Sequence, residues 1–417
     1  MINPYNVIKE IDFERLAGSE NERKAAKIFS NYLTNMGLAP KLEAFEIYSF
    51  DTGKAKITVN GKEFFAHPYG LNKNATIEGE LVFVDNPEIV ANNKGAFKDK
   101  IVMSYGFSRR LGPTLFAGGV KAYIGIGRPN KKINSSSHRQ KSFEKGYVNS
   151  VNVSYNDAIK LMKYAGKNLK IIIEQKVEKR IAHNLVVDIK GKKIDENLTL
   201  AFGHYDSVAR TSGSSDNAGG SVILLKLAEY FSKHQPLRDL RIIFFSAEEL
   251  GLLGSQNYVK THLKELQNRV KFVMNIDVAG DIIGTDHLNV IGTKEMLGYL
   301  DGITKEIGLN FYSKLEIQSS DCMPFTKYEI PSVNIHRKGG AGSSAIHTPD
   351  DSPKNVSRSG LKNTLTAATN VLERVLNAKV YPINREIDGS LRDRIEKYLY
   401  NMNYENPALE WTPKYKK

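Results

Sequence analysis

The chain has 417 residues, of which 41% are hydrophobic and 25% charged, and its formal net charge is +13. This length exceeds what one hydrophobic core usually holds, so we expect two domains. The single cysteine, Cys322, excludes an internal disulfide and favours a reducing compartment. The basic residues are mostly Lys spread along the chain, which indicates a solvated surface and argues against a nucleic-acid partner.

The N-terminus leads directly into charged, helix-like sequence and lacks the apolar core of a secretory signal. No run of 18 apolar residues suggests a membrane span. We therefore expect a cytoplasmic protein without a membrane partner. The densest basic patch, residues 128–141, contains three consecutive serines and is predicted to be a mobile surface loop.

The first predicted element is a helix that begins after Ser19 and ends at Gly37. Ser19 would cap it, with Glu22 completing a capping box. From residue 49 to 180 the sequence changes to short β-type runs separated by turns, with one or two short helices, long enough for an inserted domain. Its predicted strands cover residues 57–59, 79–84, 100–104, 122–126 and 169–174. His67 and His138 in this segment are interpreted as surface histidines.

From residue 181 to 380 apolar strands alternate with helices. The predicted strands cover residues 184–189, 198–202, 240–245, 272–276, 288–291 and 332–335, and the helices 219–232, 252–262, 294–307 and 361–376. This alternation predicts an α/β fold with three layers, helix/sheet/helix, around a central, largely parallel (mixed) sheet. Residues 1–48 are expected to join this domain. Residues 381–417 are predicted to form a polar tail with a short helix at 391–400. The tail contains Trp411, and docking on the body or on a second subunit of a homo-oligomer is left open.

Histidine and acidic residues follow the ends of several predicted strands or lie in the loops beside them. This set consists of His204, Asp206, Asp216, Glu248, Glu249, Asp277 and His347. Ligands of this type, without thiolates, suit one or two divalent ions such as Zn²⁺, Co²⁺ or Mn²⁺. Two ions about 3.5–4 Å apart would lower the pKa of a shared water toward roughly 7 and polarise a carbonyl under attack.

A glutamate that does not bind metal would then serve as general base, typically worth about 10²–10⁴-fold in rate. Each residue alone has a commonplace interpretation: His204 with Asp206 as a structural pair, Glu248 with Glu249 as a solvated helix start. Their joint occurrence in this order predicts a metal-dependent hydrolase.

Five motifs then resemble a known family. They are 203–206 (GHYD), 216–220 (DNAGG), 247–255 (AEELGLLGS), 275–280 (NIDVAG) and 347–351 (HTPDD). In them the chain resembles the M28 family of co-catalytic zinc aminopeptidases, which have a phosphorylase/hydrolase-like fold. The resemblance covers about residues 184–378 and the N-terminal helix. The inserted segment, residues 49–180, resembles the protease-associated (PA) domain found in many members.

The resemblance implies two zinc ions per chain. His204, Asp216 and Asp277 would hold one, whereas Asp216, Glu249 and His347 would hold the other, with Asp216 bridging the two ions.

It also implies roles around the metals. Glu248 would be the general base and later the proton donor to the leaving amine, and Asp206 would orient His204. A cis peptide bond is implied after Asp216. Two departures stand out: Ile346 replaces a tyrosine that stabilises the oxyanion in many members, and Cys322 replaces a histidine, where we expect a buried, inert thiol.

The leading hypothesis is an aminopeptidase that acts on peptides, with Glu248 and Asp277 as candidates for binding the substrate α-amine. A carboxypeptidase or another amidohydrolase is the runner-up, and Arg210 and Arg337 are its candidate carboxylate-binding residues. A glutaminyl cyclase would usually bind a single zinc. A non-enzymatic binding protein with this fold would be expected to lose ligands, and here all five are present.

Overall fold

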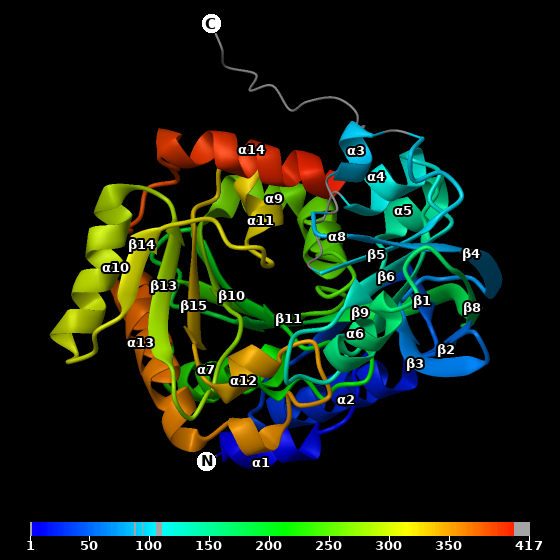
Figure 1. Cartoon of the computed structure of the whole chain (residues 1–417). Helices are drawn as coiled ribbons and strands as arrows, with labels where there is room; N and C mark the ends of the chain where they lie inside the picture. Colours follow the sequence, from blue (N-terminus) through cyan, green and yellow to red (C-terminus); the bar gives the residue numbers. More distant parts are fainter. Residues whose placement is uncertain (1, 87–88, 94, 106–110, 404–417) are drawn as a thin grey trace, which may run out of the picture.

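The computed structural model describes residues 2–86, 89–93, 95–105 and 111–403, and its centre is an eight-stranded mixed sheet (Figure 1). In spatial order the strands are β1 (Lys41–Phe50), β9 (Val177–Ile189), β11 (Asp239–Phe245), β10 (Leu198–His204), β12 (Val270–Ile276), β15 (Ser332–Lys338), β13 (Thr285–Ile291) and β14 (Tyr312–Leu315). The four central strands β11, β10, β12 and β15 run parallel, and β9 and β13 flank them in the antiparallel direction. The predicted mixed sheet is confirmed.

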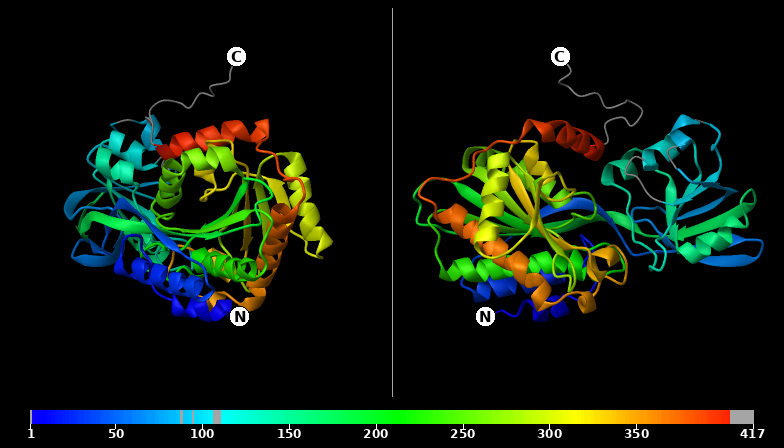
Figure 2. Two further views of the ribbon diagram at one scale, coloured as in Figure 1. Left: turned by 180° about the vertical axis from the view of Figure 1, so that it is seen from behind. Right: turned by 60° about the vertical axis from the view of Figure 1, so that its left-hand side comes forward.

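Helices cover both faces of the sheet, which confirms the three predicted layers (Figures 1 and 2). One layer contains α1 (Pro4–Glu10), α2 (Glu20–Asn35), α7 (Gly219–Lys233), α10 (Lys294–Glu306) and α13 (Arg358–Asn377). The other contains α8 (Leu253–Thr261), α9 (Leu263–Arg269), α11 (Met323–Thr326) and α14 (Gly389–Asn403). Side chains alternate between the layers along each strand, so that Met274 and Ile276 pack on the first layer and Val273 on the second.

The start of α2 is only partly as predicted. Ser19 caps the helix, because its hydroxyl accepts the N–H of Glu22 at 3.1 Å. The predicted capping box is wrong: the carboxylate of Glu22 accepts the N–H of His183 at 3.2 Å and the hydroxyl of Tyr205 instead. Because α2 packs against β9, Glu22 is fully buried and faces the sheet.

A closed seven-stranded barrel lies between β1 and β9 in the chain and stands beside the sheet (Figure 2). Its strands, in spatial order, are β2 (Lys54–Val59), β3 (Lys62–Pro68), β7 (Asn149–Val153), β6 (Ala122–Ile126), β5 (Ile101–Tyr105), β4 (Ala75–Val84) and β8 (Asn168–Glu174), and its helices are α3 (Ile89–Asn92), α4 (Leu111–Ala117), α5 (Gln140–Lys145) and α6 (Tyr155–Met162). The barrel encloses an apolar core of its own. Phe50, the last residue of β1, pairs with Val177, the first of β9, so the chain leaves and re-enters the sheet at adjacent points.

The interpretation of His67 and His138 as surface histidines is wrong. Each is only 8% exposed, and burial lowers the pKa of His67 to about 4 and that of His138 to about 3. The ring of His138 packs against the rings of Tyr69 and Tyr147. Its backbone N–H donates to the carbonyl of Gly70 at 2.9 Å. The loop before α5 is therefore packed against the barrel.

The tail helix is confirmed as α14, whose Leu391 and Ile395 are buried against the second helix layer. Trp411 lies outside the described residues. None of the helices in the described part of the chain is long and apolar enough to cross a membrane.

Candidate metal centre

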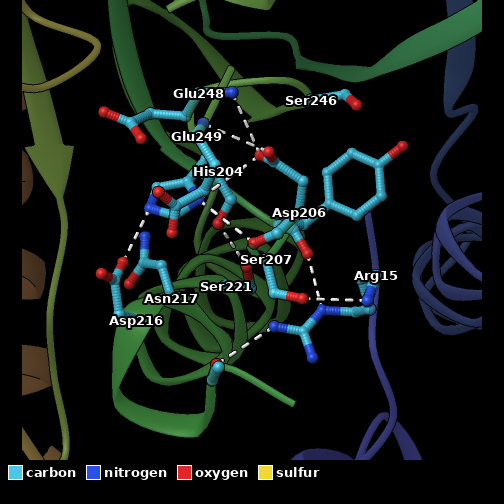
Figure 3. A network of polar contacts seen from close by, with 12 residues as sticks. Arg15, His204, Asp206, Ser207, Asp216, Asn217, Ser221, Ser246, Glu248 and Glu249 are labelled. Carbon is cyan, nitrogen blue, oxygen red and sulfur yellow. Dashed lines mark hydrogen bonds and ion pairs between the residues drawn. The ribbon is translucent and has the colours of Figure 1, made fainter. Parts of the chain in front are cut away.

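The predicted site residues meet at the carboxyl ends of β10, β11 and β12. Figure 3 shows His204, Asp206, Asp216, Glu248 and Glu249 among them. His204 is the last residue of β10, the pair Glu248–Glu249 follows β11, and Asp277 follows β12. Asp216 lies in a kinked, non-helical segment, Ser214–Ala218, that leads into α7 and contains the expected cis peptide bond. His347 follows the short helix α12 (Ala341–Ala345). Carboxyl ends of parallel strands are where open α/β sheets place ligands.

These side chains form two adjoining groups that share Asp216. In the first, His204 Nε2 lies 3.1 Å from Asp216 Oδ1 and 3.3 Å from Asp277 Oδ1. In the second, His347 Nε2 lies 3.3 Å from Asp216 Oδ2 and 3.2 Å from Glu249 Oε2. In each group one ligand atom from every residue lies within 4.8 Å of the others. The two oxygens of Asp216 therefore face different groups.

The electrostatics of the groups fit divalent cations. Burial alone would lower the pKa of His204, but Asp206, Asp216 and Asp277 raise it well above its usual value. The carboxylate of Glu249, followed by that of Asp216, raises the pKa of His347 in the same direction. The buried Oε1 of Glu249 has no hydrogen-bond partner among the described residues. Clustered carboxylates that draw protons onto both imidazoles form a site where positive charge is favoured, and the oxygen and imidazole donors suit zinc-like ions.

Asp206 supports both groups from behind (Figure 3). Its Oδ1 accepts the N–H of Glu248 at 3.2 Å, and its Oδ2 accepts that of Glu249 at 3.3 Å. The same carboxylate lies 3.4 Å from His204 Nδ1. One buried side chain thus orients the imidazole, as expected, and also fixes the turn that carries both glutamates.

Arg15 is a second supporting residue, and it was not predicted. It is fully buried, and its guanidinium donates to the carbonyls of Tyr205 at 2.7 Å and Gly213 at 3.1 Å. These carbonyls lie at the two ends of the loop that joins His204 to Asp216. No local pattern around Arg15 signals this role, because its partners are about 190 residues away in the chain.

Glu248 belongs to neither group. It is partly buried and lines a cavity of about 500 Å³ together with His204, Asp277 and His347. Burial raises the pKa of its carboxyl group well above the usual value. A raised pKa suits a group that must take up and release a proton near neutrality.

Another part of the cavity wall comes from the loop that follows β6 of the barrel. Residues 135–139 line it, and Ser135 donates its N–H to the carbonyl of His347 at 2.8 Å and its hydroxyl to that of Ala209 at 2.5 Å. The prediction of a surface loop is therefore wrong for residues 133–139, which are buried or partly buried, whereas residues 128–130 are exposed as predicted. Contacts between residues more than 200 positions apart, such as Ser135 with His347, leave no trace in local sequence.

The expectations for two arginines, Cys322 and Ile346 have different outcomes. Arg210 and Arg337 do not line the cavity; Arg210 donates to Gly53 O at 2.7 Å and Arg337 to Asp286 at 2.9 Å. The structure thus gives no support to their predicted role in binding a substrate carboxylate. Cys322 is buried, as predicted, and burial raises the pKa of its thiol to about 12, which favours an unreactive thiol. Ile346 lines the cavity with an apolar side chain.

Known proteins resemble the chain in sequence and in structure. Residues 184–372 match the model of peptidase family M28. Aminopeptidase YwaD of Bacillus subtilis is 24% identical, over 92% of this chain and 86% of its own length. The solved structure of BSAP, a zinc aminopeptidase from Bacillus subtilis, superposes with a TM-score of 0.75 at 22% identity, over 92% of this chain and 98% of its own. The solved structure of a peptidase M28 precursor from Shewanella amazonensis superposes with a TM-score of 0.76 at 19% identity, over 92% of this chain and 94% of its own. Residues 184–372 are therefore similar to peptidase family M28, and the aminopeptidases among the similar proteins support a peptide hydrolase.

Proposed function

We propose that the protein is an aminopeptidase that removes N-terminal residues from peptides with the help of two divalent ions, zinc in the first instance. His204, Asp216 and Asp277 would hold one ion. Asp216, Glu249 and His347 would hold the other. The observation that carries the proposal is the position of Asp216, whose two carboxylate oxygens lie in two different groups of potential ligands.

The proposed mechanism assigns proton transfer to Glu248. When bound, the two ions would supply a water of lowered pKa and polarise the scissile carbonyl. Glu248 would take the proton of the attacking water and return it to the leaving amine. Asp206 would hold His204 in its binding orientation and hold the backbone of Glu248 at the cavity wall. The carboxylates of Asp277 and Glu248 are the candidates for binding the α-amine.

The domain division is part of the proposal. Residues 1–48 and 181–380 would form the peptidase domain, residues 49–180 an inserted domain of the PA type, and residues 381–417 a C-terminal tail. The contact of Ser135 with His347 supports a role for the inserted domain in shaping the cleft. A cytoplasmic location, suggested by the sequence alone, remains a prediction.

The test is a panel of aminoacyl-coumarin substrates, run with and without a chelator, together with one peptide in free and N-acetylated forms. We expect chelator-sensitive hydrolysis of the free N-terminus and none of the blocked peptide. Release of the C-terminal residue from the blocked peptide would favour the carboxypeptidase alternative. Elemental analysis should find two metal ions per chain; a single ion would favour a cyclase-like site.

A further inference from the structure

The potential ligand His347 lies in a tight turn with an uncommon backbone conformation. The N–H of Thr348 donates to the carbonyl of Ala345 at 3.0 Å and closes the turn. Ile346 (φ −50°, ψ 144°) and His347 (φ 64°) have the values of the two central residues of a type II turn. The second of these positions favours glycine, and a residue with a side chain remains there only where surrounding contacts fix it.

The helix that leads into this turn, α12, is held by the carboxylate of Asp281. Its Oδ2 accepts the N–H of Gly340 at 3.2 Å, and the N–H of Ser343 lies 3.0 Å from both Oδ1 and Oδ2. Asp281 is fully buried and does not line the cavity. Because α12 has only five residues, it is not stable on its own, and its position depends on contacts of this kind.

Two glycines allow α12 to lie directly against the segment 281–283. A Cβ added at Gly342 would lie 1.9 Å from Asp281 Oδ1. One added at Gly340 would lie 1.8 Å from the carbonyl oxygen of Ile283. No side chain is accommodated at such distances, so the contact between α12 and Asp281 requires glycine at both positions.

The segment that carries Asp281 is fixed to the sheet and to the loop of the bridging carboxylate. Asp281 lies four residues after Asp277, which follows β12. Between them, the N–H of Ala279 donates to the carbonyl of Ser215 at 3.1 Å. The carbonyl of Asp281 accepts Nε of Arg337, on β15, at 2.8 Å. Asp281 therefore joins α12 to a segment that is itself held on two sides.

We propose that Asp281 is a positioning residue that keeps His347 in place for the second metal ion, by holding α12 against the segment that follows β12. The proposal rests on the two-metal function above. Asp281 acts through His347 and contacts neither metal nor substrate. Loss of its carboxylate therefore weakens the ion held by the group that contains His347 and spares the ion held by the group that contains His204.

The experiment measures zinc affinity of the full-length chain after metal removal. Zinc is titrated against a competing chromophoric chelator, which gives the dissociation constants of both ions. In Asp281→Ala we expect one ion to bind about 10–100-fold more weakly and the other to keep its wild-type constant. Asp281→Asn keeps one acceptor oxygen and should show a smaller loss of the same ion.

A double substitution tests whether Asp281 acts through His347. His347→Ala removes the ligand itself, so adding Asp281→Ala to it should weaken neither ion further. Gly342→Ala disturbs the contact from the side of the helix. Alanine favours helices over glycine, so weaker binding of the same ion in this variant would come from the collision with Asp281.

Ser357→Ala is the matched control, because Ser357 caps α13 beside the same segment. Its hydroxyl accepts the N–H of Gly360 at 3.0 Å, and its own N–H donates to the carbonyl of Gly280 at 3.0 Å. Loss of this cap should lower the melting temperature and leave both zinc constants unchanged.

Unchanged constants in Asp281→Ala and Gly342→Ala would overturn the proposal, and so would a further loss in the double variant or an equal loss in Ser357→Ala. If Asp281→Ala does not fold, Asp281→Asn and Gly342→Ala decide in its place. A wild-type chain that binds a single zinc ion would instead refute the two-metal function.

Discussion

Asp351 holds the backbone of Asp216: its Oδ2 accepts the N–H of Asp216 at 3.1 Å, and its Oδ1 accepts that of Ser215 at 2.8 Å. Asp351 is fully buried and lies four residues after His347. The loop that supplies one potential ligand therefore also positions the carboxylate shared by both groups.

Asp351→Asn should weaken metal retention. Asparagine offers a single acceptor oxygen, so one of the two backbone N–H groups would lose its partner. We expect fewer than two metal ions per chain after dialysis and at least about tenfold lower kcat/KM. Asp350→Asn is the control, because the carboxylate of the partly exposed Asp350 pairs, among the residues that the structure describes, only with Lys132, at 3.4 Å. Full metal content and activity in Asp351→Asn would show that this support is dispensable.

Substitution of the two adjacent glutamates should have different effects, on proton transfer for Glu248 and on metal binding for Glu249. Glu248→Gln is expected to keep two metal ions and lose at least about 10²-fold in kcat, because the proton acceptor is gone. Glu249→Gln should lose metal instead, since Glu249 Oε2 lies beside His347 in the second group. Elemental analysis and steady-state kinetics on both variants test which glutamate transfers the proton and which binds metal. A fully active Glu248→Gln enzyme would contradict the proposed mechanism.

Asp216→Ala should release both metal ions, because its two oxygens belong to two groups. Asp277→Ala removes a ligand from the first group only, and we expect at least one ion to remain bound. Stoichiometry by elemental analysis checks both variants. Two ions retained in Asp216→Ala would refute the bridging role.

Glu22 should make stability depend on pH. Burial raises the pKa of its carboxyl group from 4.5 to about 7. Between these values the unfolded chain releases the proton and the folded chain keeps it, so stability falls as pH rises from 4.5 to about 7. The loss is on the order of 3 kcal/mol when complete.

Glu22→Gln removes this ionisation and keeps an acceptor oxygen for Tyr205. The variant should therefore melt at a higher temperature than the wild-type chain at pH 8, with little difference at pH 5. Glu20→Gln, exposed in the same helical turn, should change neither temperature noticeably. The measurement is the melting temperature of each protein at pH 5 and pH 8. Equal melting temperatures of Glu22→Gln and the wild-type chain at pH 8 would show that ionisation of Glu22 costs the folded state little stability.

The features that could be predicted from the sequence are those that depend on neighbouring residues, such as the strands and the side chains that follow them. The apolar run before His204 is a buried strand, and a strand end fixes where the following side chain lies. Strand ends therefore account for the position of His204, Glu249 and Asp277 at one edge of the sheet, whereas Asp216 and His347 reach it from loops. Their identity as ligands stays a prediction until metal is measured.

The sequence did not predict what depends on distant partners. Glu22 matches a capping box locally, yet it accepts a hydrogen bond from His183, 161 residues further on. Serines and basic residues around Ser135 are typical of surface loops, and only the position of the barrel turns them into a cavity wall. His138 is buried for the same reason. Contacts of this kind follow from how the parts assemble.

The barrel is attached to the sheet through the paired ends of β1 and β9, where Phe50 meets Val177. It also contacts the rest of the chain through Ser135, whose N–H donates to the carbonyl of His347, and through Gln140, whose side chain bonds the backbone of Tyr48 in β1. Because His347 is a potential ligand of the second metal position, the inserted segment is joined to that position by a direct hydrogen bond. Any change in the loop 135–139 would therefore act on the geometry of His347.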